Sequence, residues 1–319
     1  MIWVIGDIHG MFDPLKRLIT ELQANHYRYN EQIEKLIFLG DYIDFGPSSK
    51  EVIDYIINLP IEKVFLMGNH DDLLLQFLYQ SELFQDFGNV WFRGNGGQRT
   101  VNSFYPEKAL RDHDESFDPS DFVLEEPYLS FFKQLKISHT ETIGDYKFAF
   151  VHGMINSEFS INDQLALQTY DDFHQWRKKN KVWIEDTPLW NREEPKNKYD
   201  DHILIHGHLP TPNLDKMWKN LYGFDTNSAL PFCKFVKSND DHEQIVFEYD
   251  QYSCAYTSSM DQLIAINCDT GAVYGHKLTA IGLSEDLLSD SEIQVNQVAV
   301  NKGYRQAINV NSLKLKMLG

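Results

Sequence analysis

The sequence predicts an α/β fold built around parallel strands. Three apolar runs near the amino terminus, at residues 2–5, 35–39 and 63–67, have the length of buried strands. Helical patterns separate these runs, as in the crossover units that make consecutive strands parallel. The chain has 319 residues, of which 42% are hydrophobic, so it can also bury a large core.

The two helices between these strands are predicted from apolar residues at helical spacing. The first opens at Asp13-Pro14, and Pro47-Ser48-Ser49 offers an N-cap for the second. Their apolar faces are Leu15, Leu18, Ile19 and Leu22, then Val52, Ile53, Ile56 and Ile57. A third helix is expected after Asp71-Asp72, where the leucine-rich residues 73–78 follow.

The remaining elements have weaker signals. Residues 128–135 and 158–183 are expected to be helical, and residues 106–122 to form a polar, acidic surface loop. Within residues 84–100, Asn95-Gly96-Gly97 indicates a loop, and a short helix is expected after it. Gly144-Asp145 predicts a hairpin between strands at residues 140–143 and 147–151. Residues 203–205, 263–267 and 272–280 read as further strands, and residues 185–201 as irregular.

Composition narrows the class of protein. The net charge of −18 and the pI of about 5.0 argue against nucleic acid as a partner, because binding to a duplex requires a basic surface. The three cysteines, Cys233, Cys254 and Cys268, favour free thiols over a disulfide scaffold or a structural zinc site. No signal peptide or membrane-spanning run is apparent, so a cytoplasmic location is expected. Non-classical export and the oligomeric state stay open.

Polar segments follow the predicted strands. They are Gly6-Asp7-Ile8-His9-Gly10, Gly40-Asp41-Tyr42-Ile43-Asp44, Gly68-Asn69-His70-Asp71, His152-Gly153 and His206-Gly207-His208. Ligands bind at the carboxyl ends of strands in open α/β sheets. Taken singly, each Asp is as readily a helix cap or a turn residue, and each His a strand-end residue. Taken together, Asp, His and Asn side chains form the ligand set of a divalent metal site.

The order of these motifs resembles the calcineurin-like metallophosphoesterases, most of all their phosphoprotein phosphatase branch. The match runs from Gly6 to His208, with a weaker one at residues 269–273. The chain is also similar to the symmetrical diadenosine-tetraphosphate hydrolases. The resemblance implies a four-layer α/β/β/α sandwich with two mixed sheets. We expect this domain to span residues 1–283, with an insertion at about residues 212–262 and a carboxyl-terminal tail at residues 284–319.

The resemblance also implies two divalent metal ions. Asp7 and His9 would bind the first and Asp41 would bridge both, while Asn69, His152 and His208 would complete the second. His208 is chosen over His206 because the family ligand follows the glycine. Manganese is the expected metal, and zinc and iron suit the same nitrogen and oxygen ligands.

Catalytic roles follow from the same resemblance. A water that bridges the metals would attack phosphorus directly, and His70, paired with Asp44, would protonate the leaving oxygen. Asn69 and Arg192, from Leu189-Trp190-Asn191-Arg192, would contact phosphate, with Arg93 and Arg99 as lesser candidates. A surface ion pair of Arg192 with Glu193 or Glu194 is the competing interpretation.

Phe45 departs from the pattern, because the family usually has an arginine there that clamps phosphate. Three interpretations stay open: the loss of one phosphate contact, stacking on an aromatic leaving group, and simple packing against a neighbouring loop.

The expected activity is that of a phosphoprotein phosphatase, acting on phosphoserine and phosphothreonine first and on phosphotyrosine as a further candidate. Asp44 favours this branch, since the dinucleoside hydrolases typically have alanine there. The expected partner is therefore a phosphorylated protein or peptide. The alternatives are a dinucleoside polyphosphate hydrolase and a weakly active scaffold that kept its metal site.

Overall fold

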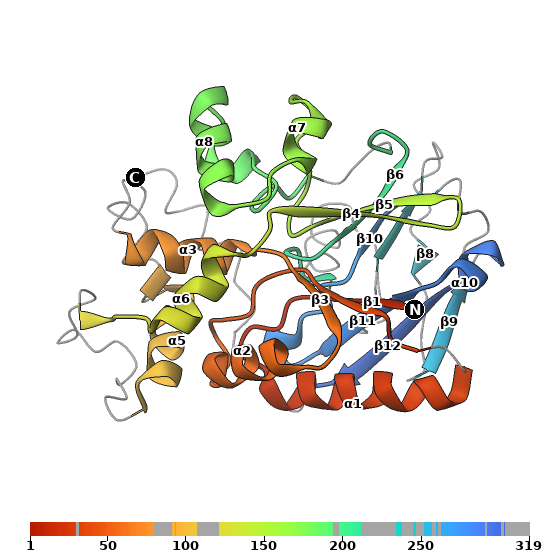
Figure 1. Cartoon of the computed structure of the whole chain (residues 1–319), viewed down its shortest axis with the longest axis horizontal. Coiled ribbons are helices and arrows are strands. Elements are labelled where there is room, and N and C mark those ends of the chain that lie inside the picture. Colours follow the sequence, from red (N-terminus) through yellow and green to blue (C-terminus); the bar gives the residue numbers. More distant parts are fainter. Residues whose placement is uncertain are drawn as a thin grey trace, which may run out of the picture.

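The computed structural model describes most of the chain. The described residues are 1–29, 32–79, 91–92, 94–106, 121–193, 198–211, 234–237, 245–246, 252–256, 260, 263–290, 292–300 and 303. They form two six-stranded sheets with helices on the outside (Figure 1).

The first sheet contains the three strands predicted from the amino-terminal apolar runs. Its order is β3-β2-β1-β11-β12-β9. The strands are β1 (Ile2–Ile5), β2 (Lys35–Phe38), β3 (Glu62–Phe65), β9 (Tyr252–Tyr256), β11 (Lys277–Leu283) and β12 (Glu292–Ala299). β1, β2 and β3 are parallel, and β11 runs antiparallel to β1. The predicted parallel core is thus present in a mixed sheet.

The second sheet has the order β4-β5-β6-β10-β7-β8. Its strands are β4 (Ser138–Ile143), β5 (Tyr146–Val151), β6 (His202–His206), β7 (Lys234–Lys237), β8 (Ile245–Val246) and β10 (Leu263–Asn267). β4 and β5 form the predicted hairpin, and β5, β6 and β10 are parallel. This sheet is mixed as well.

The helices complete four layers. They are α1 (Phe12–Tyr29), α2 (Ser49–Asn58), α3 (Asn69–Leu78), α5 (Gly97–Phe104), α6 (Glu126–Lys133), α7 (Ile161–Leu165), α8 (Tyr170–Asn180) and α10 (Glu285–Ser289). In Figure 1, α1 lies beneath the first sheet, and α7 and α8 lie above the second. The expected α/β/β/α sandwich is confirmed.

Alternation along the strands explains this layering. In β1, Val4 faces the core between the sheets, where it joins Phe150 and Ile205 of the second sheet. Its neighbours Trp3 and Ile5 point to the opposite face, into the cluster that α1 and α2 cover. Because both faces of β1 are buried, the strand is apolar throughout.

Several elements differ from expectation. Residues 272–274 form a 3-10 turn, and the strand begins only at Lys277. Residues 285–299, assigned to a tail, form α10 and β12, and β12 pairs with β11. In β12, Ile293 and Val295 alternate with Gln294 and Asn296, and this short apolar alternation was not recognised as a strand. Ser48 is the N-cap residue of α2, but its side chain makes no capping hydrogen bond.

Other expectations fall largely outside the described residues. They include most of the acidic loop at 106–122, most of the insertion at about 212–262, and Arg93, Glu194 and Cys233. The domain division therefore stays a prediction. Among the described residues, no helix combines the length and the apolar character needed to cross a bilayer.

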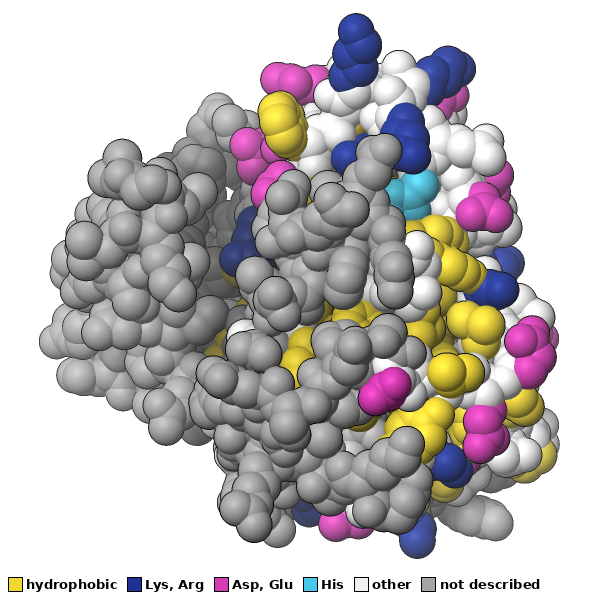
Figure 2. All heavy atoms as spheres, turned by 90° about the vertical axis from the view of Figure 1, so that its left-hand side faces the viewer, with side chains coloured by type: hydrophobic (Ala, Val, Ile, Leu, Met, Phe, Trp, Pro, Cys, Tyr) yellow, Lys and Arg dark blue, Asp and Glu magenta, His cyan; other side chains and the backbone are white. Residues whose placement is uncertain are grey.

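Charge is unevenly distributed on the surface. The chain is strongly acidic, yet Lys and Arg side chains gather at the top of the face in Figure 2, where α8 lies. The last turn of α8 carries Arg177, Lys178 and Lys179. Cations at this end interact favourably with the helix dipole, so the cluster stabilises α8.

Candidate metal centre

The side chains predicted to bind metal converge at the carboxyl ends of the strands. Asp7, Asp41 and His152 have ligand atoms that lie within 4.8 Å of one another. A second group within the same limit comprises His9, Asp41 and His70. All five side chains are buried, although they come from loops up to 145 positions apart in the sequence.

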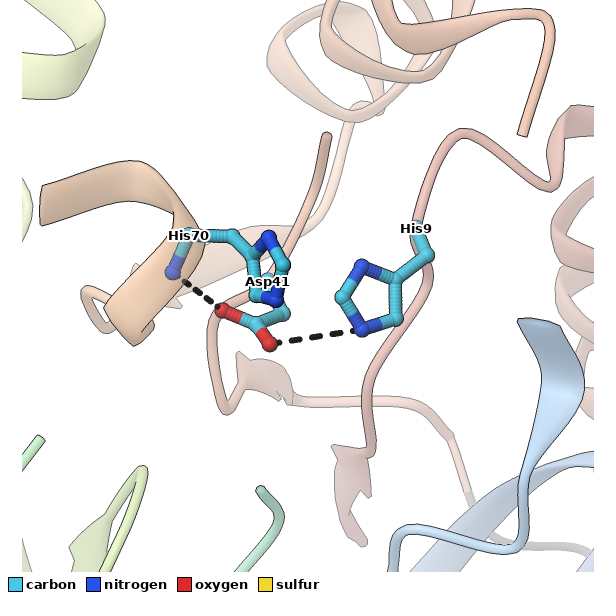
Figure 3. Close-up of side chains that lie close together, drawn as sticks. All are labelled: His9, Asp41 and His70. Atoms are coloured by element: carbon cyan, nitrogen blue, oxygen red, sulfur yellow. Dashed lines mark hydrogen bonds and ion pairs between the residues drawn. The ribbon is translucent and has the colours of Figure 1, made fainter. Parts of the chain in front are cut away.

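Asp41 lies where the two groups meet. Its Oδ2 is 3.3 Å from His9 Nε2, and its Oδ1 is 3.4 Å from His152 Nε2. The backbone N–H of His70 donates to Oδ1 at 3.0 Å. Figure 3 shows the carboxylate between His9 and the start of α3. This position suits the bridging role predicted for Asp41.

Each predicted histidine ligand is oriented by a main-chain carbonyl. Nδ1 of His9 lies 2.9 Å from Ile43 O, and Nδ1 of His152 lies 2.9 Å from Leu39 O. If these nitrogens carry the proton, Nε2 is left to bind metal.

His208 has the opposite orientation. Its Nε2 is 3.1 Å from Trp190 O, and its Nδ1 is 2.8 Å from Asn69 Oδ1. Its ligand atom would therefore be Nδ1. The side chain of Asn69 also lies 3.0 Å from His152 Nε2, so the three predicted ligands of the second ion are in contact.

The backbone of the site is unusual. Positive φ angles occur at His9 (48°), Asp41 (52°), Asp44 (74°), Phe45 (60°) and His208 (67°). Non-glycine residues adopt this region at a cost, and such residues cluster at functional sites. Among described non-glycine residues with positive φ, only Lys181, Asp200 and Asp201 are not in these loops.

Asp71 holds the loop that carries Asp41 in place, a role that the sequence analysis missed. Its Oδ2 accepts from the N–H groups of Asp41 and Gly68, each at 2.8 Å, and its Oδ1 from Tyr42 at 3.3 Å. The carboxylate is fully buried. Its place directly after Asn69-His70 was visible in the sequence, but its pairing with Asp41 and Tyr42, 30 and 29 positions away, was not.

Gly68 allows this close approach. A Cβ atom there would lie 2.3 Å from Asp41 N and 2.1 Å from Asp41 Oδ1. Only glycine lets the third loop pack directly against the bridging carboxylate.

Asp44 and His70 form the predicted pair. His70 Nδ1 is 2.6 Å from Asp44 Oδ2, which also accepts from Trp91 Nε1 at 2.8 Å. Thr100 Oγ1 donates to Asp44 Oδ1 at 2.6 Å. Asp44 has no exposed surface, so it can orient His70 but cannot reach a substrate. These contacts support the orienting role predicted for Asp44.

Phe45 packs beside this pair. Its side chain is 7% exposed, and its ring lies edge-on to His9 and His70, with centroids 5.4 and 5.2 Å away. A Cβ on Gly96 would lie 2.4 Å from Phe45 N, so the Gly96 loop covers it. Of the three interpretations, this geometry favours packing.

Arg192 lies at the edge of the site. Its Nε is 3.1 Å from His208 Nε2, within reach of a ligand beside that imidazole. The predicted alternative, a surface ion pair, is not among the described contacts of Glu193. Arg99 bonds Gly96 O through its backbone N–H.

The electrostatics of the site fit bound cations. Burial, and then the nearby Asp269 and Asp41 carboxylates, raise the pKa of Asp7 well above its usual range. Burial also lowers the pKa values of His152 and His208, which keeps them neutral. Facing buried carboxylates need a counter-charge, and neutral imidazoles are metal ligands, so this donor set suits divalent ions. Asp269, from the weaker sequence match, belongs to this cluster and was not predicted as a site residue.

The chain is similar to several known proteins. A model of the calcineurin-like phosphoesterase family matches residues 1–239. A symmetrical bis(5'-nucleosyl)-tetraphosphatase of Legionella pneumophila (strain Lens) is 39% identical over 290 residues, which cover 89% of this chain and 94% of that protein. A zinc-dependent endopolyphosphatase of Saccharomyces cerevisiae is 26% identical over 279 residues, covering 79% of this chain and 80% of that protein. A metallophosphoesterase structure from Sphaerobacter thermophilus aligns with a TM-score of 0.43 at 13% identity, covering 94% and 88% of the two chains.

These relatives correct one expectation. By name, the Legionella pneumophila and Saccharomyces cerevisiae relatives cleave nucleoside polyphosphates and polyphosphate, and none of the proteins reported above is named as a protein phosphatase. The predicted phosphoprotein or phosphopeptide partner is therefore wrong. The error came from treating Asp44 as a marker of substrate, although it is a buried support for His70.

Proposed function

Because the chain belongs to the calcineurin-like phosphoesterases, we propose that it is a metal-dependent hydrolase of dinucleoside polyphosphates, cleaving them symmetrically. The substrate class is supported by the 39% identity to a symmetrical tetraphosphatase along almost the whole of that protein. This was the alternative that the sequence had left open.

The observation that carries the reaction type is the ligand cluster beside the His70–Asp44 pair. Asp7, His9 and Asp41 would hold one ion, and Asp41, Asn69, His152 and His208 the other. When bound, two such ions neutralise phosphoryl oxygens and lower the pKa of water.

The chain's own residues supply the remaining chemistry. His70 is held through Nδ1 by Asp44, which leaves Nε2 to carry a proton to the departing phosphate oxygen. In a symmetrical cleavage that oxygen belongs to a nucleoside diphosphate. Arg192 would bind a non-reacting phosphate through a charge-assisted contact.

The identity of the metal belongs to the same proposal. Mixed imidazole and carboxylate ligands suit Mn²⁺, Zn²⁺ and Fe²⁺. We propose Mn²⁺ as the activating ion, with Zn²⁺ as the competing candidate because of the zinc-dependent yeast relative.

A product analysis tests the proposal. The full chain, loaded with Mn²⁺ or Zn²⁺, is incubated with diadenosine tetraphosphate, and the products are separated by ion-exchange chromatography. Symmetrical cleavage yields ADP alone, whereas asymmetrical cleavage yields ATP and AMP. Asp41→Asn serves as the inactive control. Absence of ADP under both metals would overturn the substrate assignment, and hydrolysis of inorganic polyphosphate in its place would favour the second relative's activity.

A further inference from the structure

Asp72 is a buried carboxylate for which the reaction has no direct use. It is the fourth residue of α3, the helix that begins with Asn69 and His70, and it has no exposed surface. Its Oδ1 lies 2.9 Å from His174 Nε2. Its Oδ2 accepts from Gln76 Nε2 at 2.6 Å and from Trp190 Nε1 at 3.4 Å. One carboxylate thus joins three segments of the chain.

The contact with Trp190 leads directly to the metal centre. The carbonyl of Trp190 and the Nε of Arg192 each lie 3.1 Å from His208 Nε2, and these two contacts hold one side of the imidazole while Nδ1 faces Asn69. The indole N–H of the same residue reaches back to Asp72. Asp72 therefore anchors the residue whose carbonyl orients His208.

The contact with His174 fixes the opposite side of the network. His174 lies on α8, and its ring packs against Tyr170 and Phe173, with centroids 4.3 and 4.8 Å away. The contact with Asp72 is largely shielded from water, since the His174 side chain is 15% exposed. Loss of His174 would deprive the buried Asp72 carboxylate of one hydrogen-bond partner, so it should disturb Asp72 and then Trp190.

The neighbouring residues Asp71 and Asp72 therefore stabilise different parts of the site. Asp71 holds the loop of Asp41. Asp72 faces the other way, toward α8 and Trp190. Partners beyond the ligands orient imidazoles and tune metal affinity, typically by about 10–100-fold.

We propose that Asp72, His174 and the Trp190 indole form a positioning network that sets the metal affinity of His208. The inference rests on the proposed function, because it takes His208 to be a metal ligand. The proposal predicts that disrupting the network weakens the binding of one metal ion more than that of the other. A purely structural role would not produce this difference.

Two disrupting variants and one restoring variant test the network without removing Asp72 itself, since loss of that side chain could prevent folding. Trp190→Phe removes the indole donor and keeps the carbonyl that faces His208. His174→Phe removes the donor to Asp72, and His174→Gln restores a side-chain N–H. Trp176→Phe is the matched control, because Trp176 also lies on α8 and packs on Phe159 at 5.7 Å but lies outside the network.

The measurement is calorimetric titration of Mn²⁺ and of Zn²⁺ into the metal-free full chain, with thermal unfolding recorded in chelator. In Trp190→Phe and His174→Phe, Kd of one ion should rise about tenfold or more, with the other ion nearly unaffected. His174→Gln should recover most of the affinity, and Trp176→Phe should bind as the wild type does.

Three outcomes would overturn the network. Unchanged Kd values in both variants, or an equal rise in Trp176→Phe, would leave only a packing role for these residues. An equal loss of both ions would also contradict a specific effect on His208. The proposed function is judged separately on the wild type: if that protein binds two ions and cleaves its substrate, only the network fails, whereas a wild type that binds no ion defeats both.

Discussion

The loops of the first sheet support one another, whereas the ligands of the second sheet depend on atoms from elsewhere. His9 is oriented by Ile43 O, Asp41 by Asp71, and Asp44 by Trp91 and Thr100, all within the first 100 residues. In the second sheet, His152 bonds Leu39 O, and the N–H of His208 donates to Asp7. The first region should therefore keep its shape when the second is altered, but the reverse should not hold.

The strongest test removes the carboxylate that both regions share. Asp41→Asn should reduce activity to background and lower the metal content, because Asp41 lies against His9, His152 and the start of α3. Elemental analysis of the purified protein measures the metal. Asp54→Asn, which alters a partly exposed pair with Lys50, is the control. Wild-type metal content in Asp41→Asn would contradict a bridging role.

A second test separates chemistry from support within the first region. His70→Asn should lower kcat/KM for alkyl phosphates by about 10²–10⁴, the usual cost of losing a general acid. Aryl phosphates should lose much less, because their leaving groups need little protonation. The backbone N–H that bonds Asp41 is retained, so metal content should not change. Equal losses of kcat/KM on all substrates would argue against His70 as the general acid.

A third test breaks the support of the first region. Asp71→Ala leaves the N–H groups of Gly68, Asp41 and Tyr42 without an acceptor and should cost roughly 1–3 kcal/mol or more in the free energy of unfolding. Urea titration in chelator measures it. Asp71→Asn keeps one acceptor oxygen and should cost less. If Asp71→Ala unfolds at the wild-type urea concentration, the loop does not depend on this carboxylate.

The smallest effect concerns pH and the second region. Burial lowers the pKa of His206 to about 4. Its neutral form is favoured in the folded state, so its contribution to stability is complete above pH ~6.5 and is lost as pH falls toward 4. One such group changes the unfolding free energy by at most about 1.4 kcal/mol per pH unit, or about 2 kcal/mol at pH 5.

The stability of His206→Gln should therefore fall less steeply between pH 6.5 and 5 than that of the wild type. Protonation of His152 and His208 contributes to the pH dependence of both proteins. Urea unfolding at pH 7.5, 6 and 5 in chelator gives the slopes. Parallel slopes would show that His206 is protonated as easily in the folded chain as in the unfolded one.

The comparison also explains what the sequence could reveal. The convergence of the candidate ligands was predictable because each follows an apolar strand within a few residues, and this local pattern places it at the sheet edge. The residues that hold these side chains and loops in place were not predictable, because Thr100 lies 56 positions from Asp44 and Asp71 lies 30 from Asp41. Their pairing depends on how loops pack, which no local pattern encodes.

The substrate prediction failed for a related reason. We inferred the phosphatase branch from the presence of an aspartate at position 44. In the structure this side chain is buried and bonded by Trp91 and Thr100. The chemistry of a residue can be read from its type, while its access to a substrate requires the structure.

The left-handed backbone at the site has an evolutionary consequence. His9, Asp41 and His208 hold conformations that glycine adopts freely and that cost other residues roughly 1–2 kcal/mol each. A lineage released from selection for hydrolysis could gain stability by drifting to glycine or asparagine at these positions. In related sequences, such replacements would therefore identify descendants that kept the sandwich after abandoning catalysis.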